Sequence, residues 1–174
     1  MKFKVNKVIG YNAICRHLGK VNAALMAIVC VLLALCVASV YSPIRFEKQR
    51  AAREDTVKRR LMLVRKAAEA YRHDHGSYTG RLQALADSGY IADSLLYIPY
   101  SGGLRFHLEA SAVTTRSGRT VPVMECSATY DEYLRGLDAD AVHALAADAG
   151  NAGRFPGLKI GDITTPGDNN GNWE

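Results

Sequence analysis

The first feature of the hydrophobic pattern is a long apolar run near the amino end of the chain. Residues 21–41, VNAALMAIVCVLLALCVASVY, contain no charged side chain. As a helix that rises about 1.5 Å per residue, this run would extend for roughly 30 Å, the thickness of the hydrocarbon core of a bilayer. The pattern therefore predicts a transmembrane helix over residues 21–41, preceded by a basic segment over residues 1–20.

Two processing signals would remove or change such an anchor. The small residues of Val37-Ala38-Ser39 are compatible with cleavage of a secretory signal, but the apolar run is longer than a signal needs and continues past this point. A lipid anchor at Cys36 would require a small residue before it, and the chain has Leu35 there. We therefore expect the anchor to stay.

A pattern with the period of an α-helix follows. Pro43 is succeeded by a segment rich in Arg, Lys, Glu and Ala, which predicts a helix from about Ile44 to a stop at Gly76. Five apolar residues recur in it at spacings of four, three, four and three, namely Val57, Leu61, Val64, Ala68 and Tyr71. This apolar stripe predicts an amphipathic helix over residues 44–76 that packs on a domain. The same stripe could also mediate assembly between the helices of neighbouring subunits.

Beyond residue 76 the pattern indicates short mixed elements. It predicts a second helix over residues 81–88, strands over 95–100, 104–113 and 120–129, a third helix over 138–148 capped by Asp138, and a last strand over 158–163. Ser117-Gly118 favours a hairpin turn, and Pro99 and Pro122 favour edge positions. The expected fold class is α+β: an N-terminal transmembrane helix continuing into a long amphipathic helix, packed on a small antiparallel sheet. Residues 77–174 would form the globular domain with a polar C-terminal tail.

Charge changes the picture because it is distributed unevenly. Residues 1–66 carry 14 Lys and Arg against 3 acids, a net +11, whereas residues 67–174 carry 8 against 14, a net −6. The basic residues before the apolar run favour a cytoplasmic N-terminus, although nine more Lys and Arg lie between Pro43 and Lys66. We expect a single-pass inner-membrane protein, in contact with the lipid bilayer, whose C-terminal domain lies in the periplasm.

Two segments could in principle bind metal. His73-Asp74-His75 could ligate zinc, but residues two apart on a helix point about 200° away from each other, so a solvated helix end is the favoured interpretation. In the tail, Asp168, Asn170 and Asn172 place oxygen atoms at alternate positions, as a calcium loop does. The spacing of the glycine differs from that loop and no later Glu follows, so a turn-rich tail pinned by Trp173 is preferred. We expect no cofactor, with calcium as a weak alternative.

Other candidate chemistry is weaker still. Lys58-Arg59-Arg60, with Arg65 and Lys66, could bind nucleic acid or anionic lipid, but stacking aromatic residues are absent from the run. Cys126, Ser127 and His143 have no adjacent catalytic partner in the sequence, and no hydrolase, zinc-protease or nucleotide-binding motif occurs. We therefore expect neither an enzyme nor a small-molecule substrate, and no nucleic-acid partner.

The order of these elements resembles the type IV pilin and type II secretion pseudopilin families. Their helix ends in an A-x-x-x-Y…G-x-Y pattern followed by L…L…G-Y-I. Here those places are taken by Ala67, Tyr71, Gly76, Tyr78, Leu82, Leu85, Gly89, Tyr90 and Ile91. The match covers about residues 44–91. The prepilin cleavage signature is missing, because Gly19 precedes Lys20 and no acid lies between residues 1 and 46.

A closer likeness is to a group of single-pass, pilin-like proteins of Gram-negative anaerobes whose function is not assigned. It is carried by PIRFE at residues 43–47, FPGLKIG at 155–161 and NNGNWE at 169–174. The resemblance implies a structural or assembly component of a secretion or pilus-like envelope machine, contacting other pilin-like subunits through its helices. The alternative is a membrane-tethered cytoplasmic module that binds lipid or nucleic acid through its basic helix; a periplasmic hydrolase is a weaker third.

Overall fold

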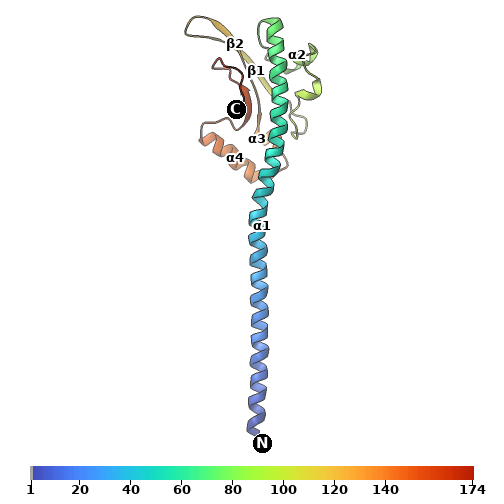
Figure 1. The fold of residues 1–174 in the computed structure, drawn as a ribbon, viewed down its shortest axis with the longest axis vertical. Helices are drawn as coiled ribbons and strands as arrows, with labels where there is room; N and C mark the ends of the chain where they lie inside the picture. Colours follow the sequence, from blue (N-terminus) through green and yellow to red (C-terminus); the bar gives the residue numbers. More distant parts are fainter. Residues whose placement is uncertain (1) are drawn as a thin grey trace. The chain divides into compact units, whose positions relative to one another are not determined.

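The computed structural model describes the backbone of residues 2–174 and the side chains of residues 22, 25–37 and 43–174. The chain divides into two compact units, residues 1–45 and residues 46–174. Its elements, in order, are α1 (Lys2–His75), α2 (Leu82–Asp87), the 3-10 helix η1 (Asp93–Leu96), β1 (His107–Thr114), β2 (Thr120–Thr129), α3 (Tyr130–Tyr133), α4 (Ala139–Asn151) and β3 (Gly157–Gly161) (Figure 1).

Helix α1 is continuous across the boundary between the units and contains Pro43 in its interior. The predicted stop at Gly76 is confirmed, since this glycine has φ +77° and its N–H donates to the carbonyl of Arg72 at 2.8 Å. A left-handed glycine directly after the last helical residue is a common way to satisfy the final carbonyl groups of a helix.

The prediction of a transmembrane helix over residues 21–41 is wrong. Among the residues that the structure describes, no helix contains an apolar stretch long enough to cross a membrane. The predicted single-pass inner-membrane location with a periplasmic domain is wrong for the same reason. The side chains of residues 1–20 and of the proposed cleavage pattern at residues 38–39 lie outside the described part.

The three strands form one antiparallel sheet in the order β1-β2-β3. In the β1–β2 hairpin Thr114 pairs with Thr120, and the predicted turn is confirmed by a hydrogen bond of 2.9 Å from the N–H of Gly118 to the carbonyl of Thr115. Strand β2 is central, so an edge position for Pro122 is wrong for the sheet as a whole. At Pro122, however, β2 has only β1 beside it, because β3 pairs with residues 125–129 alone.

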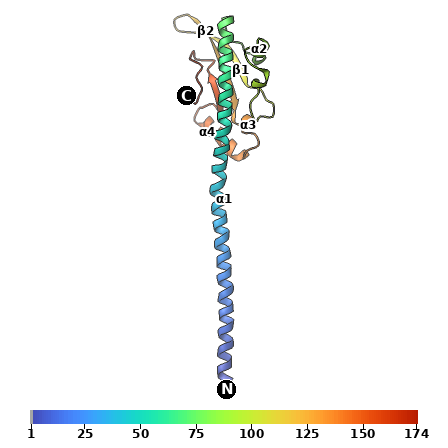
Figure 2. The same cartoon turned by 45° about the vertical axis from the view of Figure 1, so that its right-hand side comes forward.

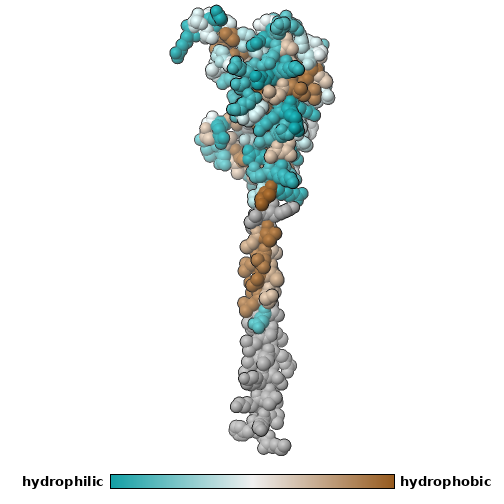
Figure 3. Space-filling model, in the orientation of Figure 1, coloured by the Kyte–Doolittle hydropathy of each residue, from teal (hydrophilic) through white to brown (hydrophobic). Residues whose placement is uncertain are grey.

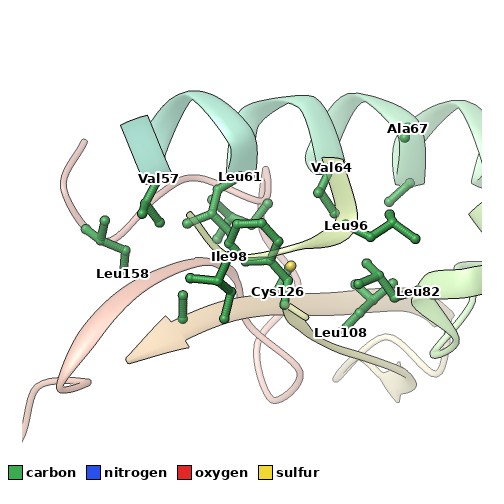
Figure 4. Close-up of a cluster of buried hydrophobic side chains, with 14 of the residues drawn as sticks. Val57, Leu61, Val64, Ala67, Leu82, Leu96, Ile98, Leu108, Cys126 and Leu158 are labelled. Atoms are coloured by element: carbon green, nitrogen blue, oxygen red, sulfur yellow. The ribbon is translucent and has the colours of Figure 1, made fainter. Parts of the chain in front are cut away.

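The core of the second unit lies between α1 and the sheet. Both ribbon views show the C-terminal part of α1 running beside the strands, with α2 next to it (Figures 1 and 2). Val57, Leu61 and Val64 are fully buried and point towards Cys126, Leu108 and Ile98 (Figure 4). The stripe predicted from the sequence therefore packs on the sheet of its own chain, which confirms its role in the α+β core.

Two local predictions differ from the structure. The strand expected over residues 95–100 is instead the end of η1 followed by one isolated bridge between Tyr97 and Arg105. Helix α3 was not predicted, although it begins with a capping box in which the Thr129 side chain and the Glu132 side chain satisfy each other's backbone N–H groups. Helix α4 begins as expected, with the Asp138 carboxylate accepting from the N–H groups of Asp140 and Ala141.

Candidate functional site

The basic side of α1 in the globular unit is engaged in contacts within the chain. Arg53 donates to the carbonyl of Arg135 at 2.9 Å, and Arg60 donates to the carbonyl of Tyr97 at 2.7 Å. Arg65 donates to the carbonyl of Asp168 at 2.8 Å. These arginines thus satisfy carbonyl groups of the loops and tail that wrap around the helix.

Three arginines of α1 are paired with carboxylates one turn away. Arg50 pairs with Glu54 at 2.8 Å, Arg65 with Glu69 at 3.1 Å, and Arg59 with Asp55. Burial opposes the charge of Arg50, but the hydrogen bond and charge of Glu54 outweigh it and raise the pKa of the guanidinium. Within the predicted basic run, Arg59 and Arg65 are therefore paired with carboxylates, whereas Lys58, Arg60 and Lys66 form no ion pair among the described residues.

The residues predicted to mediate helix packing lie inside the molecule. Val57, Leu61, Val64 and Ala68 are at most 1% exposed, and Tyr71 is half-buried against the core. Any contact between subunits through this part of α1 would have to use its other faces. Met62 and Leu63 lie there with 39% and 46% of their surface exposed.

The His73-Asp74-His75 segment forms the C-terminal turn of α1, and its two rings have separate partners. The His73 ring contacts Asp74 at 2.9 Å, whereas the His75 ring stacks on Tyr71 with centroids 4.0 Å apart. Tyr90 donates to the Asp74 carboxylate at 2.6 Å, which together with His73 lowers the pKa of that carboxyl. In the described part of the chain, no group of three or more His, Cys, Asp or Glu is placed to hold a metal ion.

The tail residues considered for calcium have structural partners instead. Asn172 donates to the carbonyl of Gly157 at 3.0 Å and its side-chain oxygen accepts from the N–H of Lys159 at 3.2 Å. Asp168 offers its backbone carbonyl to Arg65, and Asn170 accepts the N–H of Gly161 through its own carbonyl. These contacts hold the tail on β3 and α1. Asn172 could act as a metal ligand only if its contacts with β3 were broken.

The structure does not bring the candidate nucleophiles together with His143. Cys126 and Ser127 are buried in β2, whereas His143 is exposed on α4, and no hydrogen bond joins them. Burial raises the pKa of the Cys126 thiol well above its usual value. A buried thiol with a raised pKa carries almost no thiolate at neutral pH and is a poor nucleophile.

The first unit presents an apolar surface on α1. Nine large apolar side chains between residues 25 and 37 are each 48% to 67% exposed: Leu25, Met26, Ile28, Val29, Val31, Leu32, Leu33, Leu35 and Val37. Figure 3 shows them as a continuous brown band along the helix. We call this stretch the apolar segment. A band of this size without polar interruption is rare on a protein surface that has no partner.

Sequence reasoning did not identify a pocket in the globular unit, formed where α1, the start of α3, the end of α4 and the C-terminal tail meet. Its lining includes Arg50, Lys58, Tyr130, Arg154 and Trp173. These residues are far apart in the sequence and belong to no motif. Only the isolated pair Arg154-Phe155 and the single tryptophan could have drawn attention to it.

Comparisons with protein-family models, with curated proteins and with solved structures gave no match to this chain.

Proposed function

We propose that this chain is a pilin-like structural subunit that assembles with other copies of itself through helix contacts. The observation that carries the proposal is the apolar segment of α1, where nine large apolar side chains are exposed. Removing one leucine-sized side chain from water is worth about 1.5–3 kcal/mol, so a partner that covers several of them gains substantial free energy.

The spacing of the apolar segment suits other helices of the same kind. Leu25, Ile28, Leu32 and Leu35 follow one another at three, four and three residues, which is the seam of a packed helix pair. Met26, Val29 and Leu33 form a second seam with the same spacing beside it. Because two seams lie side by side, the apolar segment can pack against more than one neighbouring helix.

The occupant we infer is the same segment of further copies, for two reasons. The segment carries no charge, so identical helices can pack side by side without repulsion between like charges. In addition, the apolar stripe of α1 over residues 57–71 is already buried on the sheet, which leaves the apolar segment as the uncovered apolar part of the described helix. The resemblance to pilin-like proteins, which assemble through their N-terminal helices, agrees with this.

The competing function, recognition of nucleic acid or lipid through the basic helix, has less support. Arg53, Arg60 and Arg65 are held by backbone carbonyl groups of the same chain. A phosphate would have to displace these contacts before it could bind.

Sedimentation velocity of the full chain over a range of concentrations tests the proposal. We expect concentration-dependent oligomers that are lost in Leu32→Glu, because a buried unpaired carboxylate strongly opposes association. The matched control is Leu63→Glu, an exposed leucine on the globular part of the same helix. The control should sediment like the unchanged protein. A monomer at all concentrations, or equal effects of the two substitutions, would contradict the proposal.

A further inference from the structure

The pocket in the globular unit has a cavity volume of about 160 Å³. Arg50, Glu54 and Lys58 of α1 form one wall, Tyr130 starts α3 beside them, and Arg154 and Trp173 come from the segment after α4 and from the tail. An engineered cavity of about 150 Å³ accommodates benzene, so the volume suits a ligand of that size.

The charges around the pocket favour an anion. Arg50 is paired with Glu54, whereas neither Lys58 nor Arg154 forms an ion pair within the described part of the chain. The lining therefore carries three cationic side chains against one carboxylate. Lys58 lies 5.7 Å from the centroid of the Trp173 ring, so it is held at the pocket wall by a cation–π contact.

Apart from Gly157 and the amide of Asn172, the rest of the lining is apolar and aromatic. Phe155, Leu158, Trp173 and Ala149 contribute to it together with the ring of Tyr130. Ligand sites commonly combine such walls with a few polar groups that fix orientation. A doubly charged anion such as phosphate is less favoured than a carboxylate, because the Glu54 carboxylate would repel its second charge.

We propose that this pocket binds a carboxylate carried on a compact apolar or aromatic body. Arg154 and Lys58 neutralise the carboxylate, and the Phe155 and Trp173 rings contact the body. The carboxylate is supplied by a free small acid. This goes beyond assembly through the apolar segment and does not depend on it.

Trp173 is the only tryptophan of the chain and lies in the pocket wall, so its fluorescence reports directly on occupancy. Benzoate is the probe, and benzamide, of the same shape without the charge, is the control ligand. We expect a saturable change with benzoate and at least about tenfold weaker binding of benzamide, corresponding to about 1.4 kcal/mol. Arg154→Gln should weaken benzoate binding by a similar factor. Lys66→Gln, an exposed lysine on the same helix outside the pocket, should leave it unchanged.

Equal responses to benzoate and benzamide, or unchanged benzoate binding in Arg154→Gln, would overturn the proposal. Arg154 is exposed and unpaired, so its replacement should not disturb folding; a far-UV circular dichroism spectrum checks this.

Discussion

Two buried tyrosines of the globular unit differ in what their hydroxyl groups contact. The Tyr78 hydroxyl accepts from the side-chain amide of Asn169 at 2.7 Å, which holds the C-terminal tail on the core. The Tyr133 hydroxyl is buried and has no hydrogen-bond partner among the residues that the structure describes. The same chemical group therefore stabilises the fold at one position and costs free energy at the other.

Replacing each tyrosine by phenylalanine separates these two cases. We expect Tyr133→Phe to raise the free energy of unfolding by about 1 kcal/mol, since an unsatisfied buried hydroxyl is removed. Tyr78→Phe should lower it by about 1 kcal/mol, because the Asn169 amide loses its partner. Urea unfolding followed by circular dichroism measures both. A loss of stability in Tyr133→Phe would mean that its hydroxyl has a partner.

Glu132 makes the stability of the fold depend on pH. Its carboxylate accepts from the N–H of Thr129 at 2.7 Å and contacts the His107 ring at 2.7 Å. Burial opposes the charge, but these hydrogen bonds outweigh it and hold the pKa below its ordinary value of 4.5. A carboxyl whose pKa is lowered on folding stabilises the protein above its unfolded pKa, and this contribution is lost as the pH falls through the folded pKa.

We therefore expect the free energy of unfolding to fall steeply below about pH 4.5. Glu132→Gln should be less stable than the unchanged protein at pH 7 and should show a shallower decline in acid. Glu109→Gln, at an exposed site on β1, is the matched control and should keep the original slope. Urea unfolding at intervals from pH 3 to pH 7 measures this. Parallel curves for the unchanged protein and Glu132→Gln would contradict the assignment.

At the scale of elements, the pairing of β2 with β3 depends on close backbone approach. Gly161 has φ +72°, and a Cβ there would overlap the carbonyl oxygen of Met124 on β2. Gly157, at the other end of β3, would meet the backbone of Ala128 and Thr129 in the same way. Strand β3 can therefore join the sheet only because both of its ends lack a side chain.

Gly161→Ala should lower the free energy of unfolding by more than about 2 kcal/mol, because both the left-handed backbone and the contact with Met124 become unfavourable. Gly150→Ala is the matched control: Gly150 lies within α4 and nothing occupies the space of its Cβ. There we expect a gain of about 0.5–1 kcal/mol from the better helix propensity. Thermal unfolding of both variants measures the difference. A tolerated Gly161→Ala would contradict the β2–β3 register.

The sequence predicted those elements whose signals are local and periodic. The stripe from Val57 to Tyr71, the stop at Gly76, the turn at Gly118 and the cap at Asp138 all follow from spacing or from the chemistry of one residue. Each was recognisable because a helix or a turn needs only neighbouring residues to form.

Other features could not be predicted because they depend on residues far apart in the chain. The segment around Tyr97 has the composition of a strand, but Arg60 of α1 binds its carbonyl and β1 pairs with β2 alone. The pocket gathers Arg50, Tyr130, Arg154 and Trp173 from four separate segments. The transmembrane prediction failed for another reason: among the described residues, no helix is long and apolar enough to cross a membrane.

In the whole molecule, two parts of α1 differ in what their side chains contact. Residues 46–75 of α1 supply the core of the globular unit and bind its loops and tail through arginines. The apolar segment, residues 25–37, contributes nothing to that core and presents its side chains outwards. An exposed apolar surface of this size is typical of a contact site, and we propose that this part of α1 mediates assembly.

Two cysteines of the apolar segment can report on the proposed assembly. Cys30 and Cys36 are exposed within the apolar segment, whereas Cys126 is buried in the globular unit. Six residues along a helix correspond to a rotation of about 240°, so the two thiols face different directions. If helices of other copies surround the segment, each thiol should meet a different neighbour.

Oxidative crosslinking of the purified full chain in a Cys15→Ser background is therefore the most direct test of assembly through this segment. When Cys30 and Cys36 are both present, we expect a ladder of crosslinked products larger than the dimer on a non-reducing gel. When either cysteine is changed to Ser, crosslinking should stop at the dimer. When both are changed to Ser, no crosslinked product should form. Leu32→Glu should abolish the ladder, and Leu63→Glu should preserve it. A protein that remains monomeric with both thiols present, or a ladder that survives Leu32→Glu, would contradict assembly through the apolar segment.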